Sequence, residues 1–466
     1  MTIIPTIRLK IMLLSKPHLV FAFFSLLIGL FLVFYIPPIG GIDENHHVRR
    51  ASEVSQGIFI NPVTHTEDPL TLWSDNAWVI RKNHHEQGKP WNFADVKNIG
   101  TGQPKERTID IEQNILSLNS PVIYIPFGLV LKLAKVLFAP DYWVQFYILR
   151  ITALLLSVAL FTLAIIRMPE HKILLATAGL LPIMFYNRSG MNVDGITIGC
   201  ASLFIIQVHN LCRKNAIISF SDKLQLLLWG FLMAQCKGAY APLLFLVLFI
   251  PRGNFISRSD YWRTALLIIT PALLCGLGWS GFAKYELLAG VKYFTKETIQ
   301  VWPDGQFQWI LQHPFSYAGV VLKTIFASNF ITYNFIGMIG YLGWNGFSLP
   351  TFPIVILLLL FIAILASEPV RMPLYKSTRT RLLLLMIAGI TFGMMLTMIY
   401  VQWTGYQSPT VVGFQGRYFY PLLPLLIIFA KPIKDLVSEK RATLLLWAFG
   451  AISSASLIYS TWQGNY

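Results

Sequence analysis

The chain has 466 residues, of which 55% are hydrophobic and only 13% are charged. A soluble domain has about a quarter of its residues charged, so this composition excludes an ordinary soluble protein and indicates a polytopic, all-α membrane protein. The net charge of +15 does not indicate nucleic-acid binding, because the basic residues are interleaved between apolar segments, as the positive-inside rule requires. No nucleic-acid partner is expected.

Apolar runs of membrane-spanning length recur along the chain and predict about 11 transmembrane helices in a single transmembrane domain over residues 1–466. The first run is longer than the core of a signal peptide and no small-residue cleavage site follows it, so we interpret it as a retained span. The predicted spans lie near residues 18–37, 144–166, 172–187, 192–211, 223–235, 239–251, 264–282, 352–367, 382–402, 418–430 and 442–460.

Basic residues gather in alternate short loops, and this pattern orients the chain. The side that carries them is predicted to be the cytoplasm, with the N-terminus on that side. Two long segments, 38–143 and 283–351, are then extracytoplasmic loops. The basic residues of the cytoplasmic loops are Arg8, Lys10, Lys16, Arg167, Lys172, Arg213, Lys214, Lys223, Arg252, Arg258, Arg263, Arg371, Lys376, Arg379, Arg381, Lys431, Lys434, Lys440 and Arg441.

The two long loops are predicted to contain helices that lie in the membrane interface. At the end of the first loop, residues 120–138 alternate apolar side chains with Lys132 and Lys135, a pattern typical of an interfacial amphipathic helix. A true span over 120–138 is the alternative. The four cysteines, Cys200, Cys212, Cys236 and Cys275, show no metal-ligand spacing and are predicted to be small buried side chains.

Ionisable residues at membrane depth are costly and by default mark function. With the spans placed as above, such residues gather on the outer face. They are Asp43, Glu44, His47 and Arg50 directly after the first span, Arg150 and Arg188 at helix ends, Asp194, Lys237, and Arg417 in the sequence Gln415-Gly416-Arg417-Tyr418.

Several of these residues also have a purely structural interpretation. Arg150 and Arg188 would equally well anchor helix ends at lipid headgroups. Asp194 would equally well be a helix N-cap or an ion-pair partner. Neither Lys237 nor Arg417 has a carboxylate within one helical turn in the sequence, so each is expected to need a counter-charge from elsewhere, such as a bound phosphate.

Carboxylates beside cations suit one kind of chemistry at a membrane surface. A carboxylate can deprotonate a hydroxyl nucleophile, and cations can stabilise a departing phosphate. The combination favours transfer of a group from a lipid phosphate to an acceptor.

This arrangement resembles the GT-C class of integral-membrane glycosyltransferases, in which a catalytic carboxylate follows the first span. More closely, the chain resembles a bacterial membrane family that is found with surface-polysaccharide genes and was long labelled a domain of unknown function. The matching pieces are Asp43-Glu44-x-x-His47-x-x-Arg50, Ser120-Pro121-x-x-Tyr124-x-Pro126, Arg150, Asn192-Val193-Asp194, Lys237-x-x-Tyr240-x-Pro242, Leu342-Gly343-Trp344 and Gln415-Gly416-Arg417-Tyr418.

The resemblance implies a GT-C-like fold in a bacterial inner membrane and an inverting glycosyltransferase. It would move a sugar from a polyprenyl-phosphate donor to a cell-surface glycan on the outer face of the cytoplasmic membrane. That glycan would be an O-antigen-like part of lipopolysaccharide or another lipid-linked polysaccharide. Asp43, Glu44 and His47 would be catalytic. Substrate would be bound by Arg50, Arg150, Asp194, Lys237, Tyr240, Trp344, Gln415, Arg417 and Tyr418.

The resemblance requires no cofactor, although Asp43 and Glu44 are compatible with a divalent cation, Mg²⁺ or Mn²⁺. A small flippase and a donor-synthesising enzyme would be partners. Two other functions stay open: a polymerase or ligase of lipid-linked saccharides, which would take a pyrophosphate-linked oligosaccharide, and a flippase or transporter. A transporter would place charged residues at mid-membrane on broken spans and would show internal repeats, and neither pattern is evident in the sequence.

Overall fold

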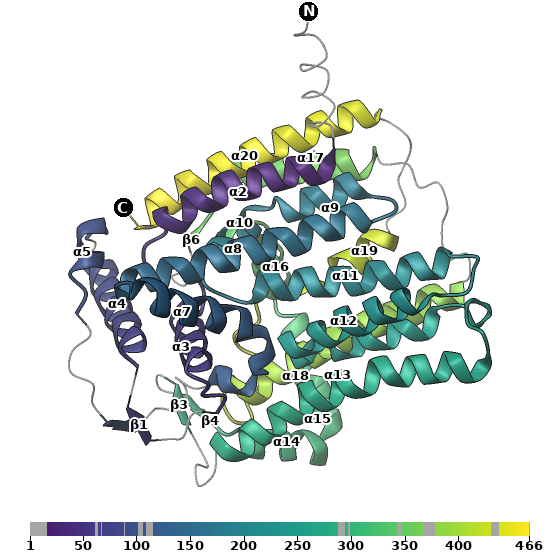
Figure 1. Cartoon of the computed structure of the whole chain (residues 1–466), viewed down its shortest axis with the longest axis horizontal. Coiled ribbons are helices and arrows are strands. Elements are labelled where there is room, and N and C mark those ends of the chain that lie inside the picture. Colours follow the sequence, from purple (N-terminus) through teal and green to yellow (C-terminus); the bar gives the residue numbers. More distant parts are fainter. Residues whose placement is uncertain are drawn as a thin grey trace, which may run out of the picture.

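The computed structural model describes residues 16–60, 64–66, 68–87, 89–100, 106–108, 115–287, 294–296, 299–342, 347–367, 378–429 and 438–465. Within these residues the chain is mostly helical, and its long helices run side by side (Figure 1). The long helices are α2 (Pro17–Tyr35), α8 (Tyr142–Arg167), α11 (Asp194–Arg213), α12 (Phe220–Cys236), α13 (Arg258–Leu287), α17 (Thr351–Leu365), α18 (Thr378–Gln402) and α20 (Glu439–Asn465).

Both long segments predicted to be loops contain helices, as expected. The first holds α3 (Glu44–Ser55), α4 (Pro69–Glu86), α5 (Phe93–Lys97), the 3₁₀ turns η1 (Ile115–Leu118) and η2 (Pro121–Tyr124), and α7 (Ile125–Phe138). The second holds α14 (Pro303–Gln312), α15 (Pro314–Ile325) and α16 (Phe330–Gly340). In Figure 1, α3, α4 and α5 gather at the end of the molecule where the C-terminus lies.

Three short antiparallel strand pairs also occur in these segments and were not predicted. They are β1 (Thr64–Thr66) with β2 (Glu106–Thr108), β3 (Phe294–Lys296) with β4 (Ile299–Val301), and β5 (Tyr341–Leu342) with β6 (Phe347–Ser348). With two or three residues per strand, they pin loops together and form no core.

Seven helices in the described part of the chain are long and apolar enough to cross a membrane. Six coincide with predicted spans, in α2, α8, α11, α13, α18 and α20. The seventh, over Pro121–Phe138, is the segment predicted to lie in the interface, so its length and composition fit the alternative of a true span. One face of α7 packs on the polar helix α3, and the other leaves Leu129, Leu133 and Val136 exposed.

The remaining predicted spans are helical but shorter or broken. The segment predicted over 172–187 is two helices, α9 (Lys172–Gly179) and α10 (Pro182–Ser189), because Pro182 cannot continue the first. The segment after Lys237 is a 3₁₀ helix, η3 (Gly238–Phe249), whose 12 residues extend about 24 Å at 2.0 Å each. The segment over 418–430 is η5 (Gly416–Leu422) followed by α19 (Leu423–Phe429).

The centre of the bundle is built on α8 and α11. Gly195 and Gly199 lie one turn apart on α11, and a Cβ at either position would collide with Ser157 or Leu160 of α8. Small residues at this four-residue spacing let two helices approach closely within a membrane. As a result, 89% of the residues in the apolar stretch of α11 are buried, and α11 lies in the interior of the bundle.

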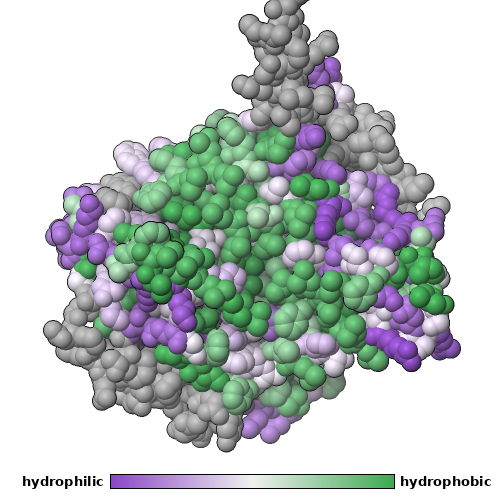
Figure 2. All heavy atoms as spheres, in the orientation of Figure 1, coloured by the Kyte–Doolittle hydropathy of each residue, from purple (hydrophilic) through white to green (hydrophobic). Residues whose placement is uncertain are grey.

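The surface agrees with a membrane setting. Apolar side chains cover the middle of the visible face, whereas polar side chains gather toward its two ends (Figure 2). Exposed apolar residues occur along α2, α13 and α18, for example Leu27, Leu274 and Leu382. Large exposed apolar surfaces of this kind are expected where helices face lipid.

Candidate functional site

Four ionised side chains from distant parts of the chain form one contiguous cluster. Lys237 Nζ donates to Asp194 Oδ1 at 2.7 Å, and Arg417 Nη1 donates to Asp194 Oδ2 at 2.5 Å. Arg417 Nη2 also donates to Asp43 Oδ2 at 3.0 Å. The structure therefore brings together four of the residues that the sequence indicated, and we call them the ion cluster.

Each member of the ion cluster stands at the end of a helical element. Asp194 is the first residue of α11, Lys237 is the extended residue between α12 and η3, and Arg417 is the second residue of η5. Asp43 precedes α3 in a left-handed conformation, with φ of 56°. A residue other than glycine costs roughly 1–2 kcal/mol in that conformation, although Asp tolerates it better than most.

Three further predicted residues support the ion cluster. Gln415 Oε1 accepts a hydrogen bond from Arg417 Nε at 2.7 Å. The Tyr418 ring lies 5.1 Å from both Lys237 Nζ and the Arg417 guanidinium carbon, within cation–π range. Tyr240 donates its hydroxyl to the Tyr418 carbonyl oxygen at 3.0 Å and so ties η3 to η5.

The ion cluster is electrically balanced by the protein itself. Lys237 and Arg417 were expected to need a counter-charge from elsewhere, such as a phosphate, and Asp194 contacts both, while Asp43 also contacts Arg417. Sequence proximity could not reveal these pairs, because Asp194 precedes the two cations by 43 and 223 residues. Burial alone would raise the pKa of the Asp43 carboxyl, but the charge of the Arg417 guanidinium outweighs burial and lowers this pKa.

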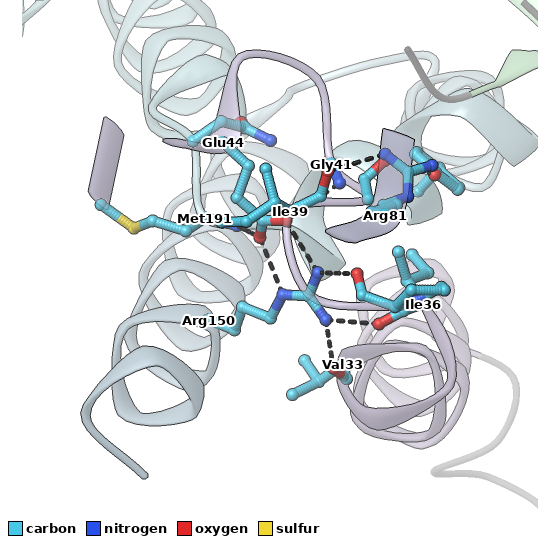
Figure 3. Close-up of polar contacts among 12 residues, drawn as sticks. Val33, Ile36, Ile39, Gly41, Glu44, Arg81, Arg150 and Met191 are labelled. Carbon is cyan, nitrogen blue, oxygen red and sulfur yellow. Dashed lines mark hydrogen bonds and ion pairs between the residues drawn. The ribbon is translucent and has the colours of Figure 1, made fainter. Parts of the chain in front are cut away.

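The surroundings of Glu44, shown in Figure 3, differ from those of its neighbour Asp43. Arg150 binds both of its oxygens, with Nε to Oε1 and Nη2 to Oε2 at 2.7 Å each. The amides of Met191 and Gly41 donate to the same carboxylate at 2.6 and 2.9 Å. The Glu44 and Arg150 side chains are both fully buried.

This environment gives both partners a structural role that was not expected. The Glu44 oxygens already accept four hydrogen bonds, so this carboxylate has no capacity left for a proton, a sugar or a cation. Arg150 donates in addition to the carbonyl oxygens of Val33, Ile36 and Pro37, so it is not free to bind substrate. The pair instead clamps the end of α2 to α8 and to the turn before α11.

His47 and Arg50 also hold the loop together. Burial lowers the pKa of His47 to about 3, which favours the neutral imidazole near pH 7. Its Nδ1 lies 2.7 Å from the Tyr124 hydroxyl. Arg50 binds Glu53 and the Phe59 carbonyl oxygen, and these contacts organise the loop after α2, whereas no described contact directs Arg50 at the ion cluster.

A cavity of about 210 Å³ opens beside the ion cluster. Asp43, His46 and Lys237 line one part of its wall. The apolar part of the lining comes from η1 and from α18 and the residue after it. Its residues include Leu116, Leu118, Met395, Met398, Ile399 and Trp403.

The contribution of α18 to this cavity could not be predicted. Met395, Met398 and Ile399 follow helical spacing, but that spacing also describes any packed or lipid-facing helix. Trp344, which was predicted to bind substrate, lies outside the described residues.

The described residues do not assemble a metal site from three or more His, Cys, Asp or Glu side chains. Asp43 and Glu44 were expected as a pair of metal ligands, but Asp43 pairs with Arg417 and Glu44 pairs with Arg150. Because the Glu44 oxygens are already used, these two carboxylates do not fit a shared divalent cation.

A family model described as predicted membrane protein, DUF2142, matches residues 26–426. The match covers most of the chain, so the protein belongs to this family of membrane proteins. No curated protein and no solved structure matches the chain.

Proposed function

For this member of a membrane-protein family, we propose a glycosyltransferase that takes its sugar from a polyprenyl-phosphate donor. The observation that carries the proposal is the cavity beside the ion cluster. Its wall combines a carboxylate and an ammonium with several apolar side chains. An amphiphile with a phosphate-linked head and a hydrocarbon tail matches that combination.

Asp43 is the proposed general base. One third of its side chain is exposed and it lines the cavity, so an acceptor hydroxyl has access to it. Arg417 holds the carboxylate in place and keeps it ionised. In the proposed step, Asp43 takes the hydroxyl proton while the acceptor oxygen attacks the anomeric carbon.

Lys237 is the proposed contact for the leaving phosphate. As the anomeric C–O bond breaks, its electron pair passes to the phosphate oxygen, and the polyprenyl phosphate leaves. An ammonium has three N–H donors, and only one of those of Lys237 is directed at Asp194. The other two donors can stabilise the phosphate without the ion cluster being broken, and a single displacement inverts the anomeric centre.

Arg417 acts as a positioning residue in this proposal. Its side chain is 4% exposed, and it is not among the residues that line the cavity. Its three described side-chain hydrogen bonds go to Gln415, Asp194 and Asp43. It therefore orients the base, whereas the first expectation had it contact the donor phosphate.

The test is transfer by the full-length protein in proteoliposomes, with a polyprenyl-phosphate hexose, a polyprenyl-pyrophosphate oligosaccharide and a lipid-linked glycan acceptor. We expect transfer from the monophosphate donor and a loss of 10²–10⁴-fold in Asp43→Asn, as is typical when a general base is removed. Asp141→Asn is the matched control, because its exposed side chain caps no helix amide. Equal transfer by wild type and Asp43→Asn would refute the proposal, and transfer from the pyrophosphate donor alone would favour the polymerase or ligase.

A further inference from the structure

A second hollow of about 460 Å³ lies far from the ion cluster, where α8 and α11 end and α12 begins. Asp194 begins α11 at the ion cluster, and Arg213 ends the same helix at this hollow. The 20 residues of α11 span about 30 Å, which is the thickness of a bilayer's hydrocarbon core. The hollow therefore faces the opposite membrane surface from the proposed active site.

The hollow is lined by polar and basic side chains from three elements. Its lining consists of Arg167, Gln207, Asn210, Leu211, Arg213, Lys214, Asp222 and Gln225. Three cations and one carboxylate leave it with a formal charge of +2. Asp222 is already used, because its Oδ2 accepts from Lys214 and from the amide and hydroxyl of Ser219, which together cap α12.

Arg167 is the cation whose charge is least compensated. Arg213 pairs with Glu170 at 2.8 Å and Lys214 with Asp222 at 2.6 Å. Arg167 instead donates to a neutral amide oxygen, Gln225 Oε1, at 2.5 Å, and within the described residues no carboxylate contacts it. A bound anion would supply the missing charge.

The walls of the hollow are fixed in place by the loops around it. Asn254 donates to the carbonyl oxygens of Leu211 and Lys214 at 2.8 and 2.7 Å, and Asn210 donates to the Arg167 carbonyl oxygen at 3.0 Å. These bonds join the end of α11 to the end of α8, and they join α11 and the residue after it to the segment before α13. A preorganised site loses less freedom when it binds a ligand.

An apolar stripe leads away from the hollow along α12. Phe220, Leu224 and Leu228 are 81%, 53% and 45% exposed and lie four residues apart, so they share one face of the helix. Leu224 is next to Gln225 of the hollow. A free anion would make no contact with this apolar stripe, whereas the acyl chain of a lipid would pack along it.

We infer that this hollow binds the phosphate-bearing headgroup of an anionic phospholipid, with an acyl chain along the stripe on α12. Basic pockets between helices at a membrane surface are suited to such headgroups. The inference is independent of the proposed glycosyltransferase, because it concerns the opposite end of the molecule.

The test measures binding to the delipidated full-length protein in neutral detergent by native mass spectrometry. The probes are dioctanoyl phosphatidylglycerol, dioctanoyl phosphatidylcholine and inorganic phosphate. We expect phosphatidylglycerol to bind most tightly. Its dissociation constant should rise about tenfold or more in Arg167→Gln, since a charge-assisted hydrogen bond is lost, and by less in Arg167→Lys, which keeps the charge.

Arg258→Gln is the matched control, because Arg258 is an exposed cation at the start of α13 outside the hollow. It should bind phosphatidylglycerol as the wild type does. Unchanged binding by Arg167→Gln would overturn the inference, as would equal binding of phosphatidylcholine. If inorganic phosphate bound as tightly as phosphatidylglycerol, the hollow would be a site for free anions, and the inference that it binds a phospholipid would be wrong. If Arg167→Gln does not fold, Lys214→Gln, which alters a half-exposed residue of the same hollow, must show the loss instead.

Discussion

Asp43 and Glu44 are neighbours in the sequence, yet they have unlike environments. Asp43 is partly exposed and contacts Arg417, whereas Glu44 is fully buried and bound to Arg150. A buried charge is tolerated only when its hydrogen bonds are complete, and those of Glu44 are. The pair therefore divides into one carboxylate available to a ligand and one that holds the fold.

Because Glu44 holds the fold in this interpretation, we expect Glu44→Gln to lose activity by destabilising the protein. The substitution would leave the Arg150 guanidinium buried without its counter-charge, which costs about 3–5 kcal/mol. Thermal unfolding in detergent should show a clear drop in midpoint. Glu86→Gln is the control: Glu86 pairs with Lys82 at 3.8 Å on an exposed surface, so its loss should cost less than about 1 kcal/mol. A Glu44→Gln protein as stable as wild type but unable to transfer sugar would restore the catalytic role first expected for Glu44.

The two cations of the ion cluster should differ in their kinetic effects if the proposed function holds. Lys237→Ala removes a contact to the phosphate both in the bound donor and as it leaves, so the KM for the donor should rise and kcat/KM should fall by about tenfold or more. Arg417→Gln removes the group that orients Asp43, so kcat should fall with little change in the KM for the donor.

The same Arg417→Gln variant makes a prediction about pH. Because Arg417 lowers the pKa of Asp43, the wild-type base stays ionised down to pH values below its ordinary pKa of about 3.9. Without Arg417, the desolvation of Asp43 raises that pKa, and activity should fall at a higher pH on the acid side. An unchanged acid limb, or identical kinetics for the Lys237 and Arg417 variants, would contradict the assignment of roles.

At the scale of elements, the apolar runs predicted the positions of most helices but not the breaks within them. Pro182 divides the segment over 172–189 into α9 and α10. The carbonyl oxygens freed at this break are satisfied from distant residues: Arg188 donates to Gly179 and Ser453 donates to Leu180, both at 2.6 Å. Arg188, which was considered as a headgroup anchor, is thus a buried cap for a broken helix. Such tertiary partners leave no local mark in the sequence.

The close approach of α8 and α11 gives a prediction at this scale. A methyl group at Gly195 would collide with the Ser157 side chain, so Gly195→Ala should lower stability by roughly 1–3 kcal/mol, the usual cost of overpacking. Ser157→Gly in the same chain should recover part of the loss, because it removes the colliding atoms. The readout is the thermal midpoint in detergent.

Gly389→Ala is the control for that substitution. Gly389 is also in a helix, but a Cβ there meets no atom within 4 Å. Replacing a helical glycine by alanine without strain stabilises by about 0.4–1 kcal/mol. If both alanine variants behave alike, the contact between α8 and α11 is looser than its geometry indicates.

At the scale of the whole molecule, the sequence predicted a helical membrane protein and singled out the residues that form the ion cluster. Charged residues are rare in this chain, so the few that lie beside apolar runs could be picked out from the sequence. These include Asp43, Asp194, Lys237 and Arg417. Their pairing could not be predicted, because it depends on which helices are neighbours. The apolar wall of the cavity could not be predicted either, since a methionine on a lipid-facing helix and one lining a cavity look alike in sequence.

The orientation of the whole molecule remains a prediction from its basic loops. The structure places the ion cluster and the second hollow at opposite ends of α11, so a loop residue near each end should be accessible from opposite sides of the membrane. Lys82 on α4 has a side chain that is 55% exposed, and Arg258 at the start of α13 is also exposed. In a variant without the four native cysteines, we expect Lys82→Cys to react with an impermeant maleimide in intact spheroplasts. Arg258→Cys should react only after the membrane is opened. The reverse pattern would place Asp43 in the cytoplasm and remove the basis for an extracytoplasmic transferase, while reaction of both residues from one side would show that the long helices do not cross the bilayer.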